Sequence, residues 1–487
     1  MAAKAIMLQG TGSDVGKSLL AAGLCRALVQ RGHSVAPFKS QNMSNNAAVT
    51  IEGGEIGRAQ ALQARASGLE PSVDMNPVLL KPQSDIGAQL VVRGEVRGNF
   101  DARAFQPVKK TLMPEILDCF ERLGADKDYV IVEGAGSAAE VNLRENDIAN
   151  MGFAMAANVP VVLIGDIDRG GVIASLVGTW ELLPDEERAL IRGYIINRFR
   201  GDMSLFDDGL TTITERTGLP SFGVLPHLPF ARDLPQEDAM SLDNAERHDT
   251  DGPIKIAVLR LAHIANFDDF DPLMAEPDVS LVWVERGDPI PGDADLVIIP
   301  GSKTTIPDLE DLRAQGWEID LAAHLRRGGH VLGICAGFQM LGTSVADPDG
   351  REGPAGAVDG LGHLDAETIL EPEKELSRVS GEAAGGLGPV EGYEMHLGRT
   401  AGPDVARPMM TLNGNPSGAM RDDGRVMGAY LHGLFANDDF RSNFLSRLKQ
   451  RDASDLSYNS RIETALDQLA DAIEIHLDVT ALLESSA

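Results

Sequence analysis

One cysteine in this sequence stands where a nucleophile would be expected. Cys335 lies between Gly333 and Gly337 and directly follows an apolar run. Glycines two residues before and after a nucleophile relieve the crowding of a sharp turn from strand to helix, and such a turn exposes the sulfur at the helix N-terminus. A thiolate placed there can attack an amide carbonyl and form a thioester that water later hydrolyses. The pattern predicts Cys335 as the nucleophile of an amide-nitrogen transfer, and a buried, inert cysteine is the alternative.

Two further segments offer groups that would assist this nucleophile. His432 follows the apolar run 426–430, so a strand end would present it as a general base. The run 296–299 leads into a tight loop at Gly301. The backbone N–H groups of Gly301 and Ala336 are predicted to bind the tetrahedral oxyanion. The alternative for His432 is a histidine whose hydrogen bonds are satisfied within the core.

A second chemical site is predicted near the start of the chain. The stretch from Gly10 to Ser18 follows an apolar run and opens a helix-like segment, and it contains Gly12, Gly16 and Lys17. Backbone N–H groups of such a glycine loop close on phosphate oxygens, and the helix N-terminus adds its positive dipole end. Lys17 would reach the terminal phosphates, and the Ser18 hydroxyl would ligate Mg²⁺. Five residues separate Gly10 from Gly16, one more than the usual pattern has.

An acidic residue completes this predicted ATP site. Glu133 ends the apolar run 129–132 and is followed by glycines. The end of a buried strand beside a phosphate loop is the usual place for a carboxylate that ligates Mg²⁺. We therefore predict ATP and Mg²⁺ at this site, with Ser18 and Glu133 as metal ligands. The alternative for Glu133 is a helix cap.

The segments between these residues predict an α/β fold. Short apolar runs without strict alternation suit strands buried on both faces, and their spacing leaves room for crossover helices. The runs lie at residues 5–8, 35–38, 129–132, 160–164, 194–196, 254–259, 296–299, 330–334 and 426–430. The architecture expected is a phosphate-loop NTPase-like parallel sheet domain followed by a second α/β domain.

Composition shifts suggest where these domains begin and end. Residues 1–233 are predicted as the ATP-binding domain, the acidic and polar stretch 234–253 as a linker, and residues 254–450 as the domain of Cys335. Residues 451–487 are predicted as a helical segment with an apolar packing face. Residues 346–360, rich in Asp, Gly and Pro, are predicted as a surface loop.

Charge and cysteine content restrict the partners and the compartment. The chain of 487 residues has a net charge of −30, which argues against nucleic acid and against an anionic membrane surface as partners. Its three cysteines are far apart and form neither a disulfide framework nor a metal-ligand spacing. No signal-peptide pattern is recognised at the start. These features predict a cytoplasmic protein, and they leave its oligomeric state open.

Both sites resemble known families. The longer phosphate loop resembles dethiobiotin synthetase and its relatives, which activate a carboxylate as an acyl phosphate. The Cys335 segment resembles the class I, triad-type glutamine amidotransferases. Those enzymes usually carry a glutamate two residues after the histidine, but position 434 is leucine here. The cobyrinate and cobyrate subgroup lacks that acid, and Glu394 is one candidate for orienting His432 instead.

Taken together, the chain resembles the cobyric acid synthase family of cobalamin-pathway amidases over nearly its full length. The stretches that carry this resemblance are 37–46, 80–85, 165–171, 197–202 and 392–396. The resemblance implies glutamine-dependent and ATP-dependent amidation of the b, d, e and g carboxylates of a corrinoid, adenosylcobyrinic acid a,c-diamide. It also implies that Asn197, together with residues 223–226, grips the adenine base.

The polar amides Gln41, Asn42, Asn45 and Asn46 are predicted to contact the corrinoid, because amides can donate to and accept from carboxylate and amide groups alike. An asparagine-rich turn is the alternative. Two other functions stay open. A sibling enzyme that amidates the a and c side chains shares both sites and differs in the 41–46 segment. A ParA-like ATPase switch is opposed by glycine at position 12, where such ATPases carry a second lysine, and by Cys335.

Overall fold

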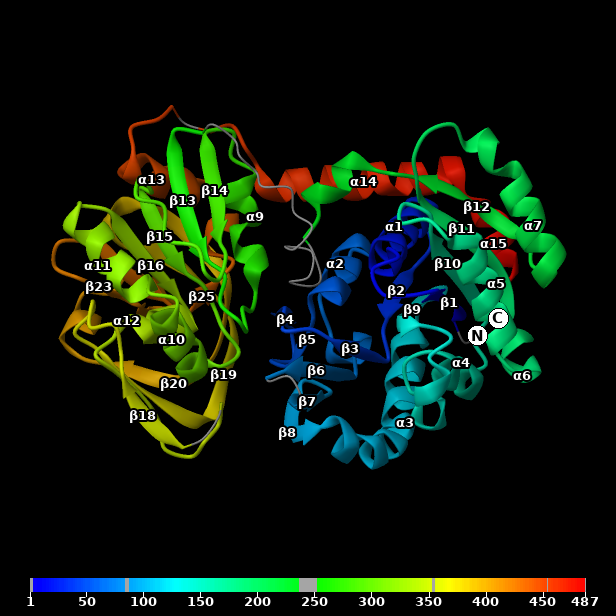
Figure 1. The fold of residues 1–487 in the computed structure, drawn as a ribbon, viewed down its shortest axis with the longest axis horizontal. Helices are drawn as coiled ribbons and strands as arrows, with labels where there is room; N and C mark the ends of the chain where they lie inside the picture. Colours follow the sequence, from blue (N-terminus) through cyan, green and yellow to red (C-terminus); the bar gives the residue numbers. More distant parts are fainter. Residues whose placement is uncertain (1–2, 84–86, 236–251, 353–354, 453, 487) are drawn as a thin grey trace. The chain divides into compact units, whose positions relative to one another are not determined.

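The computed structural model describes residues 3–83, 87–235, 252–352, 355–452 and 454–486. The chain divides into two compact units (Figure 1). The first contains Met1–Ser44, Thr50–Glu237 and Arg461–Ala487. The second contains Asn45–Val49 and Asp238–Ser460. Each unit is built on its own parallel sheet.

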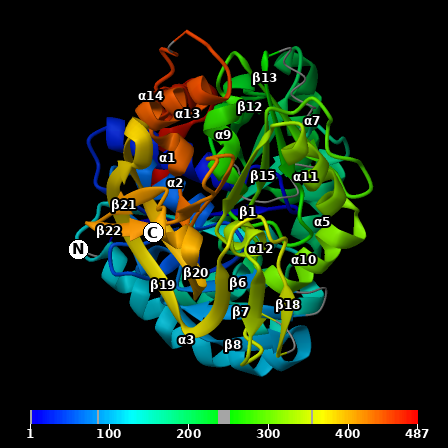
Figure 2. The same ribbon diagram turned by 90° about the vertical axis from the view of Figure 1, so that its left-hand side faces the viewer.

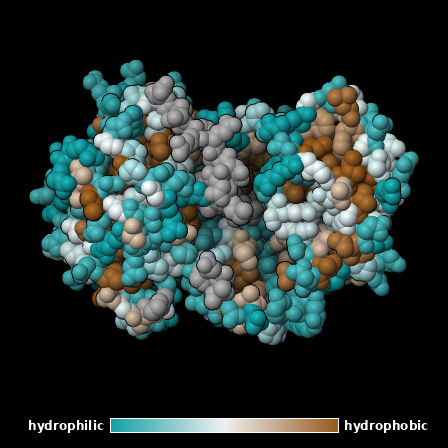
Figure 3. Space-filling view, in the orientation of Figure 1, coloured by the Kyte–Doolittle hydropathy of each residue, from teal (hydrophilic) through white to brown (hydrophobic). Residues whose placement is uncertain are grey.

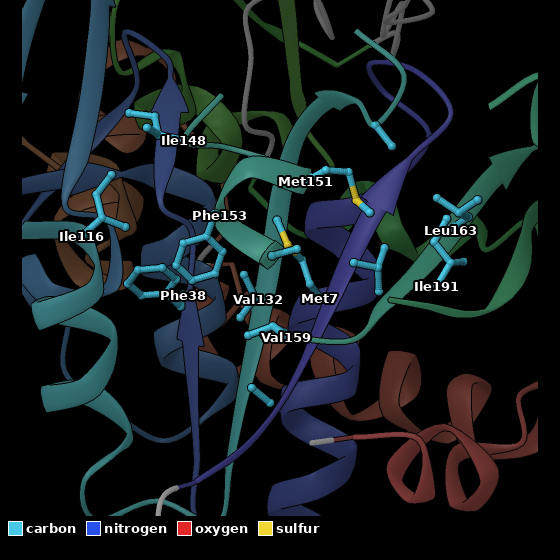
Figure 4. Close-up of a cluster of buried hydrophobic side chains, with 14 of the residues drawn as sticks. Met7, Phe38, Ile116, Val132, Ile148, Met151, Phe153, Val159, Leu163 and Ile191 are labelled. Carbon is cyan, nitrogen blue, oxygen red and sulfur yellow. The ribbon is translucent and has the colours of Figure 1, made fainter. Parts of the chain in front are cut away.

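The sheet of the first unit has the order β12-β11-β10-β1-β9-β2, and all its neighbouring strands are parallel. Its strands are β1 (Lys4–Gly10), β2 (Val35–Phe38), β9 (Tyr129–Ser137), β10 (Val161–Asp166), β11 (Ile191–Phe199) and β12 (Ser221–Pro226). Strand side chains alternate between the two faces, so Met7 and Leu8 of β1 are buried in different layers. Figure 4 shows the Met7 layer, where Phe38, Val132 and Phe153 pack together.

Helices cover both faces of this sheet, because each face is apolar. The helices are α1 (Lys17–Gln30), α2 (Arg58–Ala66), α3 (Ala102–Gly124), α4 (Met151–Ala157), α5 (Val172–Leu182), α6 (Asp185–Arg188), α7 (Asp207–Thr217), α14 (Tyr458–His476) and α15 (Val479–Glu484). A smaller sheet has the order β3-β6-β7-β8, with β3 (Gln41–Met43), β6 (Val78–Pro82), β7 (Gly87–Val92) and β8 (Glu95–Asp101). Strand β5 is Glu55–Gly57.

The main sheet of the second unit has the order β14-β13-β15-β16-β24-β23, and only β23 runs antiparallel to its neighbour. Its strands are β13 (Ile254–Leu259), β14 (Val279–Val284), β15 (Leu296–Ile299), β16 (His330–Ile334), β23 (Ala419–Met420) and β24 (Val426–Ala429). Its helices are α9 (Asp271–Met274), α10 (Thr305–Ala314), α11 (Trp317–Arg326), α12 (Ala336–Leu341) and α13 (Asp438–Leu448).

A second sheet of this unit is dominated by two long antiparallel strands, β19 (Glu367–Ala383) and β20 (Gly388–Ala401), which are prominent in Figure 2. The order is β18-β17-β19-β20-β25, and β21 and β22 extend it from β19. The remaining strands are β17 (Ser344–Asp347), β18 (Gly356–Asp359), β21 (Met410–Leu412), β22 (Asn415–Ser417) and β25 (Leu431–His432). Strand β4 (Ala47–Val49) also belongs to the second unit.

The predicted α/β fold class is confirmed, and a strand lies at every apolar run named above. The prediction of a surface loop at residues 346–360 is wrong in part, because β18 forms there and pairs antiparallel with β17. The division into units differs from the predicted domains at two places. Residues 461–487 pack within the first unit, and residues 45–49 pack within the second. The predicted linker, 234–253, lies largely outside the described residues.

The C-terminal helix α14 joins the first unit through a polar face and an apolar face. Arg26 of α1 forms ion pairs with Glu463 and Asp467. Gly23 of α1 leaves the space that Leu469 and Ile473 fill, since a Cβ there would lie 2.6 Å from Leu469 Cγ. The predicted packing face of this helix is therefore confirmed.

Hydrophilic residues predominate on the face shown in Figure 3, as expected for a chain with a net charge of −30. Among the described residues, no helix combines the length and the apolar character that crossing a membrane requires.

Candidate active sites

The Cys335 site is built on a strained turn at the carboxyl end of β16. Cys335 has φ 53° and ψ −111°, a conformation that non-glycine residues rarely adopt. It precedes α12, and its Sγ donates to the backbone carbonyl of Met395 at 3.4 Å. A Cβ at Gly333 would lie 2.5 Å from the backbone carbon of Gly337. The two flanking glycines thus allow strand and helix to meet closely, and this packing holds the turn in place.

His432 lies at the end of β25 beside this cysteine, and a carboxylate holds it. Asp269 Oδ2 lies 2.7 Å from His432 Nδ1, and Asp269 Oδ1 accepts from the backbone N–H of Gly433 at 2.7 Å. His432 is 1% exposed. A Cβ at Gly301 would lie 3.3 Å from His432 Cε1 and 3.8 Å from Cys335 Cβ, so the imidazole and the sulfur adjoin the same loop. The structure therefore assembles a cysteine, a histidine and an aspartate as a triad.

The protonation of His432 follows from its surroundings. Burial alone would lower the pKa of its imidazole. The charge and the hydrogen bond of Asp269, together with the adjacent Cys335 sulfur, outweigh burial and raise the pKa of His432 to about 10. The imidazole is consequently protonated at neutral pH, with Nδ1 directed at Asp269.

The prediction that Glu394 orients His432 is wrong. Tyr393 is the β20 residue that lies opposite His432 in the sheet, and Glu394 lies opposite Leu431. Successive strand residues point to opposite faces, so the Glu394 side chain points away from the Tyr393 side. Its carboxylate accepts from the Ser417 hydroxyl at 3.1 Å, and burial raises its pKa.

Sequence reasoning missed Asp269, although a signal was present. Strand β13 pairs with β15, whose end leads into the Gly301 loop. Side chains that follow the carboxyl ends of neighbouring parallel strands lie at one edge of a sheet. Asp268 and Asp269 follow β13 within a short acidic stretch, residues 266–271. The strand order was needed before these carboxylates could be connected with Cys335.

The predicted oxyanion loop is held by a buried carboxylate. Asp308 is 1% exposed and accepts hydrogen bonds from the Ser302 hydroxyl at 2.6 Å and the His263 backbone N–H at 3.1 Å. The Gly301 carbonyl accepts from Ala265 N–H at 2.9 Å. The N–H of Ala336, as the first residue of α12, has no carbonyl four residues earlier within the helix to bond. The oxyanion role of the Gly301 and Ala336 N–H groups stays a prediction.

The phosphate loop joins β1 to α1 as predicted. Gly16 has φ 92°, and a Cβ there would clash with the Asn197 side chain. Asn197 Nδ2 donates to the Val15 carbonyl at 2.9 Å, so this asparagine supports the loop. Lys17 Nζ donates to the carbonyls of Gly12 at 3.0 Å and Gly136 at 2.9 Å. The lysine thus lies across the loop, close to where phosphate groups would be bound.

Glu133 lies at the centre of a hydrogen-bond network beside this loop. Its Oε1 accepts from the Ser18 hydroxyl at 2.7 Å and from Lys39 Nζ at 2.8 Å. Its Oε2 accepts from Gln63 Nε2 at 2.6 Å and from Gln60 Nε2 at 3.3 Å. Lys39 and the glutamines are functional candidates that sequence reasoning missed. All three are polar residues buried beside a conspicuous acid.

The donor set fits Mg²⁺. This cation is usually held by one or two carboxylates, and phosphate oxygens and waters supply its other ligands. Glu133 and Ser18, which the sequence predicted as ligands, approach each other within 2.7 Å. Within the described ranges, no three His, Cys, Asp or Glu side chains gather to hold a metal ion.

The four amides predicted to contact the acceptor are divided between the two units. Gln41 and Asn42 belong to the first unit, and Asn45 and Asn46 belong to the second. Asn42 Nδ2 donates to Gln60 Oε1 at 2.9 Å. Asn46 is 2% exposed, and its Oδ1 accepts a hydrogen bond from the protein backbone. Contact with the corrinoid stays a prediction for this segment.

Comparisons with known proteins agree with both sites. The family of the CobQ/CobB/MinD/ParA nucleotide binding domain matches residues 6–240, and the family of the CobB/CobQ-like glutamine amidotransferase domain matches residues 255–440. The cobyric acid synthase of Bradyrhizobium diazoefficiens is 60% identical over 481 residues, which are 99% of this chain and 99% of that protein. That of Rhodobacter capsulatus is 61% identical over 98% of this chain and 99% of that protein. The chain belongs to the cobyric acid synthase family.

Proposed function

We propose that this protein uses ATP and glutamine to amidate the b, d, e and g carboxylates of adenosylcobyrinic acid a,c-diamide. One observation supports this most. The Cys335–His432–Asp269 triad and the phosphate loop with Glu133 occur in one chain that matches relatives named cobyric acid synthase over nearly their full length. Glutamine and a corrinoid are the partners this proposal requires.

The second unit releases ammonia from glutamine. The Cys335 thiolate attacks the amide carbon, and the backbone N–H groups of Gly301 and Ala336 stabilise the oxyanion that forms. Protonated His432 gives its proton to the amide nitrogen, and the C–N bond breaks. Ammonia departs, and the acyl group remains on Cys335 as a thioester. Neutral His432 then takes a proton from water, and the resulting hydroxide cleaves the thioester to glutamate. Asp269 holds the imidazole in the required tautomer throughout.

The first unit activates the acceptor carboxylate. The Lys17 ammonium and the loop N–H groups stabilise the charge of the phosphoryl group as it passes to a carboxylate oxygen. Ammonia then attacks the acyl phosphate, and phosphate leaves. Glu133 and Ser18 would hold Mg²⁺, and when bound this cation would neutralise charge on the phosphate oxygens. To accept the cation, Glu133 would have to release some of its present hydrogen bonds.

The decisive experiment incubates the protein with ATP, Mg²⁺, glutamine and single corrinoids, and follows products by mass. With the a,c-diamide, we expect mass changes for successive amidations, with intermediates that appear and are consumed. Each amide should consume one ATP and one glutamine. If the a,c-diamide is inert and unamidated cobyrinic acid stops after two additions, the sibling a,c-diamide synthase activity replaces this proposal.

A further inference from the structure

One segment of five residues from the first half of the sequence belongs to the second unit. Asn45–Val49 belongs to the second unit, whereas the residues on both sides belong to the first. The Asn45–Val49 segment is fixed by a reciprocal pair of hydrogen bonds with Asn266. Asn266 N–H donates to Asn46 Oδ1 at 2.7 Å, and Ala47 N–H donates to Asn266 Oδ1 at 3.1 Å. Both asparagines are at most 3% exposed, and removing the Asn46 side chain would take away the oxygen that accepts from the buried Asn266 N–H.

The partner of this segment is the residue that starts the Asp269 turn. Asn266 has φ 53° and caps the short 3₁₀ helix Phe267–Phe270. Asp269 N–H donates to the Asn266 carbonyl at 3.1 Å. The position of Asn266 therefore sets the position of Asp269, whose two oxygens hold His432 Nδ1 and Gly433 N–H.

The same segment also bonds to the tyrosine that covers one face of the imidazole ring. Tyr393 stacks on His432, with ring centroids 5.2 Å apart and 20° between the planes. The Tyr393 hydroxyl donates to the Ala47 carbonyl at 3.2 Å. Ala47 thus donates its N–H to Asn266, which positions Asp269. Its C=O accepts from the hydroxyl of Tyr393, whose ring covers His432. The supports of two contacts of His432, the bond to Asp269 and the stacking of Tyr393, therefore both involve the Asn45–Val49 segment.

At its other end the segment continues into the first unit. Strand β3 ends at Met43, and Asn42 of this strand donates to Gln60, which donates to Glu133. Only residues 43–45 separate Asn42 from Asn46. A change in the partners of Glu133, such as the arrival of a cation and nucleotide, would therefore act on a chain segment that leads directly to the support of His432.

We propose that Asn46 and Tyr393 are positioning residues of the glutaminase reaction, through which the occupied first unit places His432 and Asp269 for catalysis. The contacts that position His432 all lie within the second unit. The effect of an occupied first unit on glutamine hydrolysis rests on the function proposed above. Neither residue touches the reacting atoms, so each acts through the imidazole.

The expected signature is a change in the pH profile of glutamine hydrolysis. A less firmly held Asp269 supports the imidazolium less, so the pKa of His432 falls and the alkaline limb of the rate moves to lower pH. Cys335, Glu394 and His396 also have a charge interaction with His432. The substitutions below leave these three residues in place.

The test measures glutamate release from glutamine in the full-length protein between pH 6 and 10, first without ATP or corrinoid. In Asn46→Ala we expect kcat to fall about ten-fold, the scale of one lost buried hydrogen bond, with KM for glutamine nearly unchanged. In Tyr393→Phe, which keeps the stacked ring and removes only the hydroxyl, we expect a smaller fall of about three-fold. Both variants should show the shifted alkaline limb. Asn443→Ala is the matched control, because Asn443 lies on α13 in the same unit and its amide donates a hydrogen bond to the Leu387 carbonyl.

A second set of measurements adds ATP, Mg²⁺ and the a,c-diamide. We expect glutamate release by the unmodified protein to rise, and this rise to be reduced in both variants. Amidation supported by ammonium salts should persist in Tyr393→Phe. A loss of kcat with an unshifted pH profile, or a Tyr393→Phe variant identical to the unmodified protein in both measurements, would overturn the proposal. A failure to amidate any corrinoid would count against the proposed function alone, because hydrolysis without acceptor tests the positioning separately.

Discussion

Replacing Asp269 with asparagine is the most informative single change, because it alters one charge and almost no volume. Asp269 accepts two hydrogen bonds, one from His432 Nδ1 and one from Gly433 N–H. An asparagine has one accepting oxygen, so its NH₂ group must face one of these two donors. The variant therefore loses the negative charge and at least one of the two bonds.

The size of the effect follows from the pKa of His432, which the surroundings raise from 6.5 to about 10. One pKa unit corresponds to about 1.4 kcal/mol, so a shift of this size favours the protonated form by roughly 5 kcal/mol. Asp269 and Cys335 share this effect and burial opposes it. If Asp269 supplies about half, its loss removes about 2 to 3 kcal/mol of support for the imidazolium, which lowers the pKa of His432 by about two units. Burial, no longer opposed by Asp269, then lowers the pKa toward its ordinary value.

The assay is glutamate release from glutamine between pH 6 and 10. We expect kcat of Asp269→Asn to be about 10²-fold lower at pH 7, with an alkaline limb at lower pH. Ammonium-supported amidation should be unchanged, because the ATP site is untouched. Asp268→Asn is the matched control, since it removes a neighbouring buried carboxylate but keeps both hydrogen bonds of Asp269. An Asp269→Asn variant with kcat within about three-fold of normal and an unshifted profile would show that the carboxylate does not determine the protonation of His432.

Four other changes have defined outcomes. Cys335→Ala should lower glutamine-supported amidation by about 10³-fold or more but spare the ammonium-supported reaction, and a folded variant that lost both would refute two separable sites. Glu133→Gln should lower amidation from either nitrogen source by about 10²-fold or more, measured as phosphate release, and a near-normal rate with ammonium would contradict its assignment. Gly16→Ala should destabilise the first unit by about 1 to 2 kcal/mol, because Gly16 has φ 92° and the added methyl group would meet the Asn197 side chain. Calorimetry should also show weaker nucleotide binding, and normal binding would refute this. The raised pKa of His432 stabilises the fold fully below about pH 6.5, and this contribution disappears as the pH rises through about 10, so the free energy of unfolding should fall more steeply over that range in the unmodified protein than in a folded His432→Gln variant.

Strands and nucleophile could be predicted because their signals are local. A strand buried on both faces must be apolar without interruption, so Val35–Phe38 and Ile254–Leu259 were visible as runs and are strands with those bounds. The turn at Cys335 needs small residues on both sides, which the sequence shows within five positions. In each of these cases the physical requirement and the residues that meet it lie next to each other in the chain.

The partners of these residues could not be predicted in the same way. Asp269 and His432 are 163 positions apart, and their contact depends on the order of strands in the sheet. The partner of Asn46 could not be predicted, because a buried asparagine and an exposed one have the same local sequence. Only the structure shows that its oxygen is already bonded to the Asn266 backbone.

The carboxylate that holds His432 comes from Asp269, so no acid is needed at position 434, which is leucine. An acid two residues after the histidine would have to point from this turn toward the imidazole. Here that position is 1% exposed and belongs to an apolar cluster with Phe435 and Phe440. A carboxylate directed into this apolar cluster would be desolvated without a partner there. Asp269 approaches instead from the turn that follows β13, where Gly433 N–H and His432 both meet it. That turn begins at Asn266, whose N–H donates to Asn46 Oδ1. The turn that supplies the acid therefore also binds Asn45–Val49, a segment from the ATP-binding half of the sequence. In this way the position of the acid connects His432 with that segment.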